Sequence, residues 1–252
     1  MFHCRDHAGK LWPLNRRIFS YLLRMVNSGK ARKAAFKMIL ITLIALLVLL
    51  SAAVLGWLIS TTIVAVWGIF LAVWVVFALF TLYFFRDPTP RVPTDRNLVV
   101  SPGHGKVDVV DTTSEPAFMG GECQRVSIFL SVFDVHVQNA PVGGRVAHFK
   151  YTEGQFLNAM KTESATQNEN VLIGFEANEP KGTKLGIRLI AGLIARRIVP
   201  WVENGTAVAR GDRISLIQFG SRVDVYLPRS ASIKVKIGDR VVGGETVLAV
   251  LD

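Results

Sequence analysis

The dipeptide Gly220-Ser221, within the run QFGSRVDVYLP near the C-terminus, has the residue types for chemistry on the main chain. A serine hydroxyl can attack a neighbouring carbonyl carbon, and a glycine before it leaves room for that attack and for the distorted backbone it needs. The chain could therefore cut itself at this bond and make a cofactor from the serine. The alternative is a Gly-Ser turn between two strands, since both residues are frequent in turns. Taken alone, the dipeptide favours the turn.

A long stretch without charge stands far upstream of this dipeptide. No Asp, Glu, Lys or Arg occurs from Met38 to Phe85, and small and polar residues near its middle divide it into two apolar segments, about 38–59 and 62–85. Each segment is long enough for a helix to cross the bilayer core of about 30 Å. A secretory signal does not fit, because the stretch is too long and starts too far into the chain. We expect a transmembrane helical hairpin; the alternative is a pair of buried core helices.

The charges on either side of this hairpin predict its orientation. Residues 1–37 carry nine Lys and Arg against the single Asp6, and three arginines follow the second segment. Because positive charge is retained on the cytoplasmic side, both ends should lie there, at the inner membrane. Nucleic acid is the usual rival partner of a basic arm, but the adjacent hairpin favours an anionic lipid surface. Apolar residues at near-helical spacing suit a helix lying on headgroups: Leu11, Ile18, Tyr21, Leu22, Met25 and Val26.

Residues 86–252 follow a different pattern, which completes a division into a basic arm (1–37), a hairpin (38–85) and a catalytic domain (86–252). Short runs rich in Val, Ile and Phe are cut by glycines, and apolar and polar residues alternate from Val223 to Leu227. This pattern predicts a mostly β (β-rich α+β) sandwich or barrel. One amphipathic helix is expected from Leu185 to Ile198.

The C-terminal segment Val235–Val250 resembles the hammerhead strand and turn of biotinyl and lipoyl carrier domains. Two further segments, Gly205–Gly220 and Pro141–Phe156, share its strand, GD or EG turn and second strand. We therefore expect an architecture like a barrel-sandwich hybrid. The lysine signature of a carrier domain is missing, which argues against a carrier function.

The cysteines and histidines indicate neither a disulfide framework nor a metal site. Cys4 and Cys123 lie on opposite sides of the hairpin in sequence, and a cytoplasmic location would keep both reduced. The histidines form no Cys/His or HExxH cluster, and no Gly-rich phosphate loop follows a strand and opens a helix. The patterns of the usual bound cofactors are therefore absent from the sequence.

Several sequence blocks, taken together, resemble one family. They are YFFRDPTPRVP (Tyr83 to Pro93), VSPGHGKV (Val100 to Val107), FLSVFDVHVQNAPVGG (Phe129 to Gly144), ATQNENV (Ala165 to Val171) and QFGSRVDVYLP (Gln218 to Pro228). After a hydrophobic hairpin and in this order, they look like the short, membrane-associated form of phosphatidylserine decarboxylase. The resemblance implies decarboxylation of phosphatidylserine to phosphatidylethanolamine and CO2. It also implies a pyruvoyl cofactor, the electron sink that such chemistry needs.

By this resemblance, the pyruvoyl group comes from Ser221 after self-cleavage at Gly220-Ser221, which gives a β chain, 1–220, and an α chain, 221–252. His136 is then the best candidate for the base that activates Ser221 and for the group that protonates Cα after CO2 leaves. The alternative is a strand histidine packed in the core. Asp134 shares a face with His136 if the strand is regular; it can orient the histidine or cap a turn.

One position departs from the family pattern. Where the family usually reads P-A-D-G, this chain has Pro102-Gly103-His104-Gly105, so a histidine replaces the aspartate of a Ser/His/Asp set. An aspartate in that role holds the tautomer of the imidazole. His104 can instead act as a direct base on Ser221 or use Asp134. The change leaves a second hypothesis open: an uncleaved, non-catalytic relative with a structural or lipid-binding role.

Substrate contacts are less clear from the sequence. A phosphodiester headgroup requires cationic or N–H donors, and Arg145, Lys150, Lys161 and Arg222 are near the motifs, although each also fits a solvated strand edge. Acyl chains could meet Phe156, Leu157 and Met160, for which core packing is the alternative. A homodimer of αβ units is a further expectation. A membrane-fusion-type adaptor of an export system is the third function class, but the chain has no sustained heptads for its coiled-coil arm.

Overall fold

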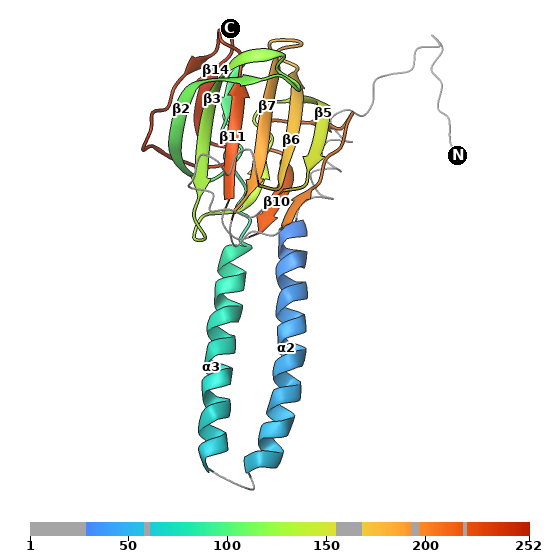
Figure 1. Ribbon diagram of the computed structural model, residues 1–252, viewed down its shortest axis with the longest axis vertical. Helices are drawn as coiled ribbons and strands as arrows, with labels where there is room; N and C mark the ends of the chain where they lie inside the picture. The colour runs from blue at the N-terminus through green and yellow to red at the C-terminus, as the bar shows by residue number, and fades with distance from the viewer. Residues whose placement is uncertain (1–28, 58–60, 155–167, 193–196, 219–220) are drawn as a thin grey trace, which may run out of the picture.

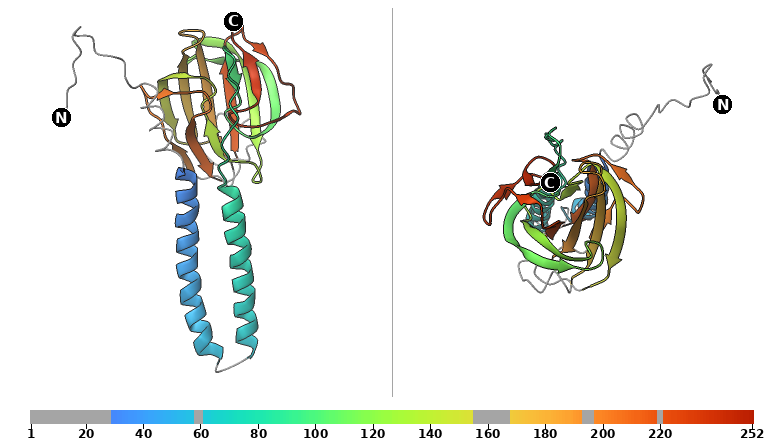
Figure 2. Two further views of the ribbon diagram at one scale, coloured as in Figure 1. Left: turned by 180° about the vertical axis from the view of Figure 1, so that it is seen from behind. Right: turned by 90° about the horizontal axis from the view of Figure 1, so that it is seen from above.

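The computed structural model describes residues 29–57, 61–154, 168–192, 197–218 and 221–252 (Figure 1). Two long helices, α2 (Lys30–Trp57) and α3 (Thr61–Phe84), run side by side away from a β-rich domain, as the views from front and back both show (Figure 2). The segments Arg32–Gly56 and Thr62–Phe84 are long and apolar enough to cross a membrane. The predicted hairpin is therefore present, and the first helix begins several residues earlier than expected.

Threonine hydroxyls of the hairpin are satisfied within their own helices, while apolar side chains are exposed. The hydroxyl of Thr42 donates to the carbonyl oxygen of Met38 at 3.0 Å, and that of Thr81 donates to Phe77 at 2.8 Å. Large hydrophobic side chains such as Val54, Leu55 and Ile69 are exposed. Satisfied polar groups beneath an apolar surface are what a lipid environment requires.

The β domain consists of antiparallel strands in three sheets. The largest has eight strands in the order β13 (Arg240–Val241), β2 (Gly105–Glu115), β3 (Gly121–Leu130), β11 (Ser221–Leu227), β7 (Lys184–Ala191), β6 (Asn170–Ala177), β5 (Gly144–Thr152) and β9 (Ala207–Val208). The two smaller sheets are β1 (Leu98–Val100), β14 (Val247–Val250) and β12 (Ser232–Ile233), and β4 (Val137–Asn139), β10 (Arg213–Gln218) and β8 (Arg197–Pro200). The large sheet curves around the core (Figure 2), but the described strands close no barrel. The prediction of a mostly β domain after a helical hairpin is confirmed.

Strand β11 lies near the middle of the large sheet and separates two environments. Its residues Val223, Val225 and Leu227 point into the hydrophobic core, where they join apolar residues of β3 and β7. Arg222 and Asp224, between them, are also buried and belong to the opposite face. By the alternation along the strand, Ser221 belongs to the same face of β11 as Val223, the face toward the core. It pairs with Leu130 of β3 and Ala191 of β7.

The helix expected from Leu185 to Ile198 is wrong. Strand β7 occupies Lys184–Ala191 and β8 occupies Arg197–Pro200, while residues 193–196 lie outside the described part. Strand β7 is buried over most of its length, so its apolar residues follow one another without alternation and imitate a helical stripe. Arg188, within the expected helix, pairs with Glu115 of β2 at 3.4 Å.

The hairpin joins the β domain through an apolar cluster. Phe84 and Phe85, at the end of α3, pack with Ala35 of α2 and with buried residues of β4 and β10, Val137 and Leu216. Because these side chains are almost fully buried, the end of the hairpin is part of the domain's own packing. The start of the basic arm, residues 1–28, lies outside the described residues.

Candidate active site

Ser221 is a buried serine at the first position of β11. Its hydroxyl oxygen has no hydrogen-bond partner among the residues that the structure describes. An unsatisfied buried hydroxyl costs about 1–3 kcal/mol, so such groups are uncommon unless they have a function. Gly220, the other half of the predicted cleavage site, lies outside the described residues.

His136 is buried directly before β4. Its Nδ1 lies 2.9 Å from the carbonyl oxygen of Asp134, and because a carbonyl only accepts, Nδ1 carries the proton. The ring packs on Phe84, with centroids 4.3 Å apart. Burial lowers the pKa of His136 to about 4. The imidazole is therefore neutral at physiological pH, and Nε2 carries the lone pair that a base needs.

Asp134 belongs to a turn, and the expectation that it shares a strand face with His136 is wrong, because β4 begins only at Val137. Its carboxylate accepts from the backbone N–H and the hydroxyl of Ser131, both at 2.8 Å, and pairs with Arg240 at 3.3 Å. Of the two roles left open for the carboxylate, the cap is the one seen. The main-chain carbonyl of Asp134 is the group that orients His136.

His104 lies in the loop before β2 and faces Asn139. A Cβ atom added to Gly243 would lie 3.0 Å from Nε2 of His104 and 2.9 Å from Oδ1 of Asn139, so both side chains border the same glycine. The Nδ2 amide of Asn139 donates to the carbonyl oxygen of Gly211 at 2.9 Å, which fixes the orientation of its Oδ1.

The pKa of His104 is lowered, first by burial and then by the positive charge of Arg86. The carboxylates of Asp134, Glu245 and Asp87 oppose this shift. His104 in turn contributes to the lowered pKa of His136, so the two imidazoles are electrostatic neighbours.

These groups meet at the end of the domain that joins the hairpin. Gly103, next to His104, lies against Leu130 and Val223: a Cβ atom added to this glycine would lie 3.6 Å and 3.7 Å from their side chains. Leu130 is the residue that pairs with Ser221. The structure therefore brings His104 and His136 into one cluster and places Ser221 at the same end of the sheet.

Asn168 and Glu169, within the block ATQNENV, support the strand beside Ser221. The Nδ2 amide of Asn168 donates to the carbonyl oxygen of Ala191 at 2.7 Å, and the N–H of Ala191 donates to the carbonyl oxygen of Glu169 at 2.9 Å. Since Ala191 pairs with Ser221, this motif helps to fix the backbone against which Ser221 lies.

The predicted phosphate contacts separate into different environments. Arg222 is buried and paired with Asp108 on the face of β11 opposite to Ser221. Arg145 forms an exposed pair with Glu176 at 3.1 Å, and Lys150 is exposed on β5. Lys161 and the predicted acyl-chain contacts Phe156, Leu157 and Met160 lie outside the described residues.

Sequence reasoning missed Arg86 and Asn139 as members of this site. Arg86 follows the end of α3 and donates to the carbonyl oxygen of Phe133 at 2.6 Å. Both residues stand within blocks that carried the family resemblance. Their roles depend on contacts with residues distant in sequence, Phe133 and Gly211, which no local pattern reveals.

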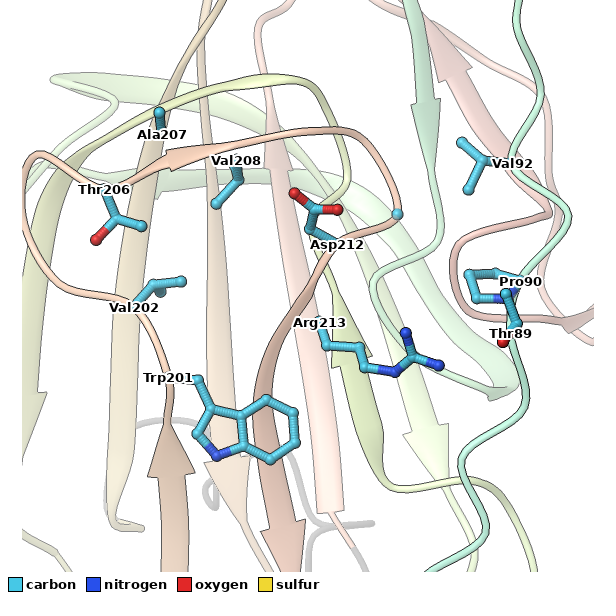
Figure 3. Close-up of a pocket in the computed structure, with 11 residues that line it drawn as sticks. Thr89, Pro90, Val92, Trp201, Val202, Thr206, Ala207, Val208, Asp212 and Arg213 are labelled. Carbon is cyan, nitrogen blue, oxygen red and sulfur yellow. The ribbon is translucent and has the colours of Figure 1, made fainter. Parts of the chain in front are cut away.

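A cavity of about 110 Å³ adjoins Gly211, the glycine whose carbonyl oxygen accepts from Asn139. Figure 3 shows the residues that line it. Its wall is formed by the segment after α3 and by the hairpin around β9 and β10: Thr89, Pro90, Val92, Trp201, Val202, Thr206, Ala207, Val208, Gly211, Asp212 and Arg213. Arg213 is already bound to Asp87, at 2.7 Å. The cavity therefore adjoins the His104 and Asn139 cluster through Gly211 but contains none of the predicted catalytic residues.

Comparisons with known proteins identify the family of this chain. The family model of phosphatidylserine decarboxylase matches residues 77–249. Phosphatidylserine decarboxylase proenzyme of Desulfotalea psychrophila is 46% identical over 169 residues, 67% of this chain and 78% of the relative. The proenzymes of Symbiobacterium thermophilum and Erythrobacter litoralis are each 44% identical, over 68% of this chain and 79% and 73% of their own lengths. The chain therefore belongs to the phosphatidylserine decarboxylase family.

Proposed function

We propose that this chain is a membrane-anchored decarboxylase that converts phosphatidylserine to phosphatidylethanolamine and CO2, with a pyruvoyl group made from its own Ser221. The observation that carries the proposal is the Ser221 hydroxyl, buried without a hydrogen-bond partner in the described chain, at the start of the strand that follows Gly220. A hydroxyl without a partner is free to react. The names of the relatives, which call them proenzymes, are consistent with a chain that must mature.

Maturation would proceed by an acyl shift. The Ser221 oxygen attacks the carbonyl carbon of Gly220, the peptide C–N bond breaks, and an ester forms. Elimination across Cα and Cβ of residue 221 releases the carboxylate of residues 1–220 and leaves a dehydroalanine, whose hydrolysis gives the pyruvoyl group and ammonia. When in place, this group supplies the electron sink for decarboxylation.

His136 has the properties of the base in this scheme. Its bond to the carbonyl of Asp134 fixes the tautomer, and its lowered pKa, about 4, keeps Nε2 unprotonated and ready to take the serine proton. A proton held on Nε2 is given up readily for the same reason. His136 is therefore also suited to donate this proton to the carbon atom that loses CO2.

The position of the site fits a substrate that stays in the bilayer. His136 packs on Phe84, the last residue of α3, so the candidate chemistry lies next to the point where the hairpin ends. Tethering raises the effective concentration of a lipid headgroup at such a site. We place the catalytic domain, residues 86–252, on the cytoplasmic side of the inner membrane, with the basic arm on the same anionic surface. A homodimer of αβ units stays a prediction of the resemblance.

Denaturing electrophoresis with intact-mass measurement of the purified protein tests the proposal. We expect two fragments, 1–220 and 221–252, the smaller with a blocked N-terminus, and release of CO2 from phosphatidylserine vesicles. Ser221→Ala should leave one chain. Ser127→Ala is the matched control, because it removes the hydroxyl of another buried serine, on the neighbouring strand β3. Cleavage in Ser221→Ala, or a wild-type chain that stays whole with an ordinary serine, would refute self-maturation.

His104 supports a second candidate function. A histidine at the position where the family usually has an aspartate leaves His136 without that carboxylate, so an uncleaved relative with a structural or lipid-binding role is the alternative. A whole chain that still binds phosphatidylserine vesicles would favour it.

A further inference from the structure

The turn between β3 and β4 carries an exposed aromatic side chain. Phe133 is 63% exposed, whereas phenylalanine is among the residue types most often fully buried. The turn is closed by the N–H of Asp134, which donates to the carbonyl oxygen of Ser131 at 2.9 Å, and by the two bonds from Ser131 to the Asp134 carboxylate. Phe133 is therefore presented on a defined turn.

This turn is bonded to the last turn of α3. The hydroxyl of Tyr83 donates to the carbonyl oxygen of Phe133 at 3.1 Å, and the guanidinium of Arg86 donates to the same oxygen at 2.6 Å. The guanidinium also lies 4.0 Å from the centre of the Tyr83 ring. The loop after β3 reaches down beside the end of α3 in Figure 1 and again in the view from behind in Figure 2. Tyrosine and arginine at the end of an apolar helix mark the level of the membrane interface, so Phe133 stands at that level.

Two exposed basic side chains lie on strands beside this turn. Arg240, 77% exposed, pairs with Asp134 in the same turn. Lys106, also exposed, lies opposite Arg240 and Phe129 in the strand register. An exposed aromatic residue with Lys and Arg beside it is the composition of surfaces that bind anionic lipid.

We propose that the turn Ser131–Asp134 is a second membrane contact, which inserts Phe133 into the interfacial layer of an anionic phospholipid bilayer. The proposal rests on the hairpin crossing that bilayer, as in the function proposed above. It has a consequence for catalysis. The carbonyl of Asp134 holds Nδ1 of His136, so the turn that meets the lipid also positions the candidate base at the level of the headgroups.

Depth-dependent fluorescence quenching in the full-length protein tests this contact. A bimane label is placed at Phe133→Cys in a Cys4→Ser background, where the remaining Cys123 is buried, and the protein is reconstituted in phosphatidylglycerol-rich vesicles with brominated lipids. Leu79→Cys, exposed on α3, is the control for the hairpin. Lys181→Cys, exposed on the β6–β7 turn at the other end of the sheet, is the control for a position in water.

We expect quenching at position 133 by shallow brominated lipids, well above the signal at position 181. Quenching at 79 with none at 133 would overturn the membrane contact and leave the anchor intact. No quenching at 79 would overturn the anchor itself, and the contact with it. Excimer formation between labels at 133 without quenching would show that a second copy of the chain covers Phe133, which also overturns the proposal.

A kinetic readout covers the case in which the label disturbs the turn. Phe133→Ser should raise the KM for phosphatidylserine, measured as its mole fraction in vesicles, severalfold, with kcat and self-cleavage unchanged, while Phe133→Trp keeps the wild-type KM. An unchanged KM in Phe133→Ser, or a loss confined to kcat, would contradict an interfacial role.

Discussion

The low pKa of His136 determines which protonation state the candidate base has in the cell. Burial is the main cause, and the positive charge of Arg86 adds to it, while the carbonyl bond and the charge of Asp134 oppose it. A histidine whose pKa falls from 6.5 to about 4 is neutral over the whole physiological range. The environment of His136 thus keeps Nε2 unprotonated and available to Ser221, although burial makes the imidazole a weaker base.

This protonation state predicts the pH dependence of self-cleavage. If neutral His136 is the base, the cleavage rate of freshly translated chain should show no step near the ordinary histidine value of 6.5 and should fall only as pH approaches about 4. His136→Ala should slow cleavage by roughly 10²–10⁴-fold, the usual contribution of a general base. A half-maximal rate near pH 6.5 would assign the limiting proton transfer to a more exposed group.

His104 should also affect the rate of self-cleavage. Its imidazole lowers the pKa of its neighbour His136, whereas a carboxylate there would raise the basicity of His136 and stabilise the imidazolium that forms. We therefore expect His104→Asp to speed cleavage, followed by pulse-chase electrophoresis. Gly103→Ala is a useful control for disturbance of the loop, since its Cβ would meet only ordinary contacts. An unchanged or slower rate in His104→Asp would indicate that His104 acts as a base itself.

At the level of elements, β11 begins with the candidate nucleophile Ser221 and also has a buried polar face. Asp224 is fully buried opposite Ser127 of β3, and burial raises its pKa more than the Ser127 hydroxyl and the nearby arginines lower it. Three arginines stand near it, but each has its own carboxylate: Arg222 with Asp108, Arg125 with Asp111, and Arg188 with Glu115. Each of these arginines is therefore already neutralised by another carboxylate, and the charge of Asp224 is not required to balance them.

Asp224→Asn should therefore stabilise the protein at neutral pH by about 1 kcal/mol, because it removes a buried charge whose desolvation outweighs the stabilisation by Ser127 and the nearby arginines. The sign follows from the raised pKa. The wild type binds a proton more tightly when folded, so its stability is greatest below the unfolded value of 3.8 and declines as pH rises through the folded pKa. In Asp224→Asn, the free energy of unfolding should no longer decrease over this pH range on account of residue 224. Thermal unfolding in detergent at several pH values measures both effects, and Asp111→Asn, which breaks a part-exposed pair, should bring no gain.

The elements differ in how far the sequence predicts them. The hairpin is predicted well, because lipid requires long stretches without charge, and Met38–Phe85 has none. The alternation in Val223–Leu227 also marks a real strand. Strand β7 is mistaken for part of a helix, since burial removes the alternation that identifies a strand. The role of Asp134 is half predictable: a cap follows from local spacing, but the use of its carbonyl depends on the three-dimensional turn.

At the scale of the whole molecule, the hairpin and the candidate site form one packed unit. Phe84 belongs to α3, to the apolar junction and to the surroundings of His136 at once. Phe84→Ala should therefore destabilise the junction by about 3–5 kcal/mol, as expected for a buried phenylalanine, and also slow self-cleavage. Leu79→Ala, on the exposed part of the same helix, should leave the cleavage rate unchanged. Equal cleavage rates for the two variants would show that packing at the junction does not affect self-cleavage.

The orientation of the whole molecule follows from its charge. The nine Lys and Arg of residues 1–37, against one acid, should hold both ends of the hairpin on the cytoplasmic side. A cysteine at Lys181, exposed at the end of the domain away from the hairpin, reports the side directly in a Cys4→Ser background. We expect a membrane-impermeant maleimide to label Lys181→Cys in inverted membrane vesicles and not in intact spheroplasts. Cys123 is buried and its thiol pKa is raised by burial, so the parent protein should show little background. Labelling in spheroplasts would place the domain outside and would require phosphatidylserine in the outer leaflet, contrary to the charge argument.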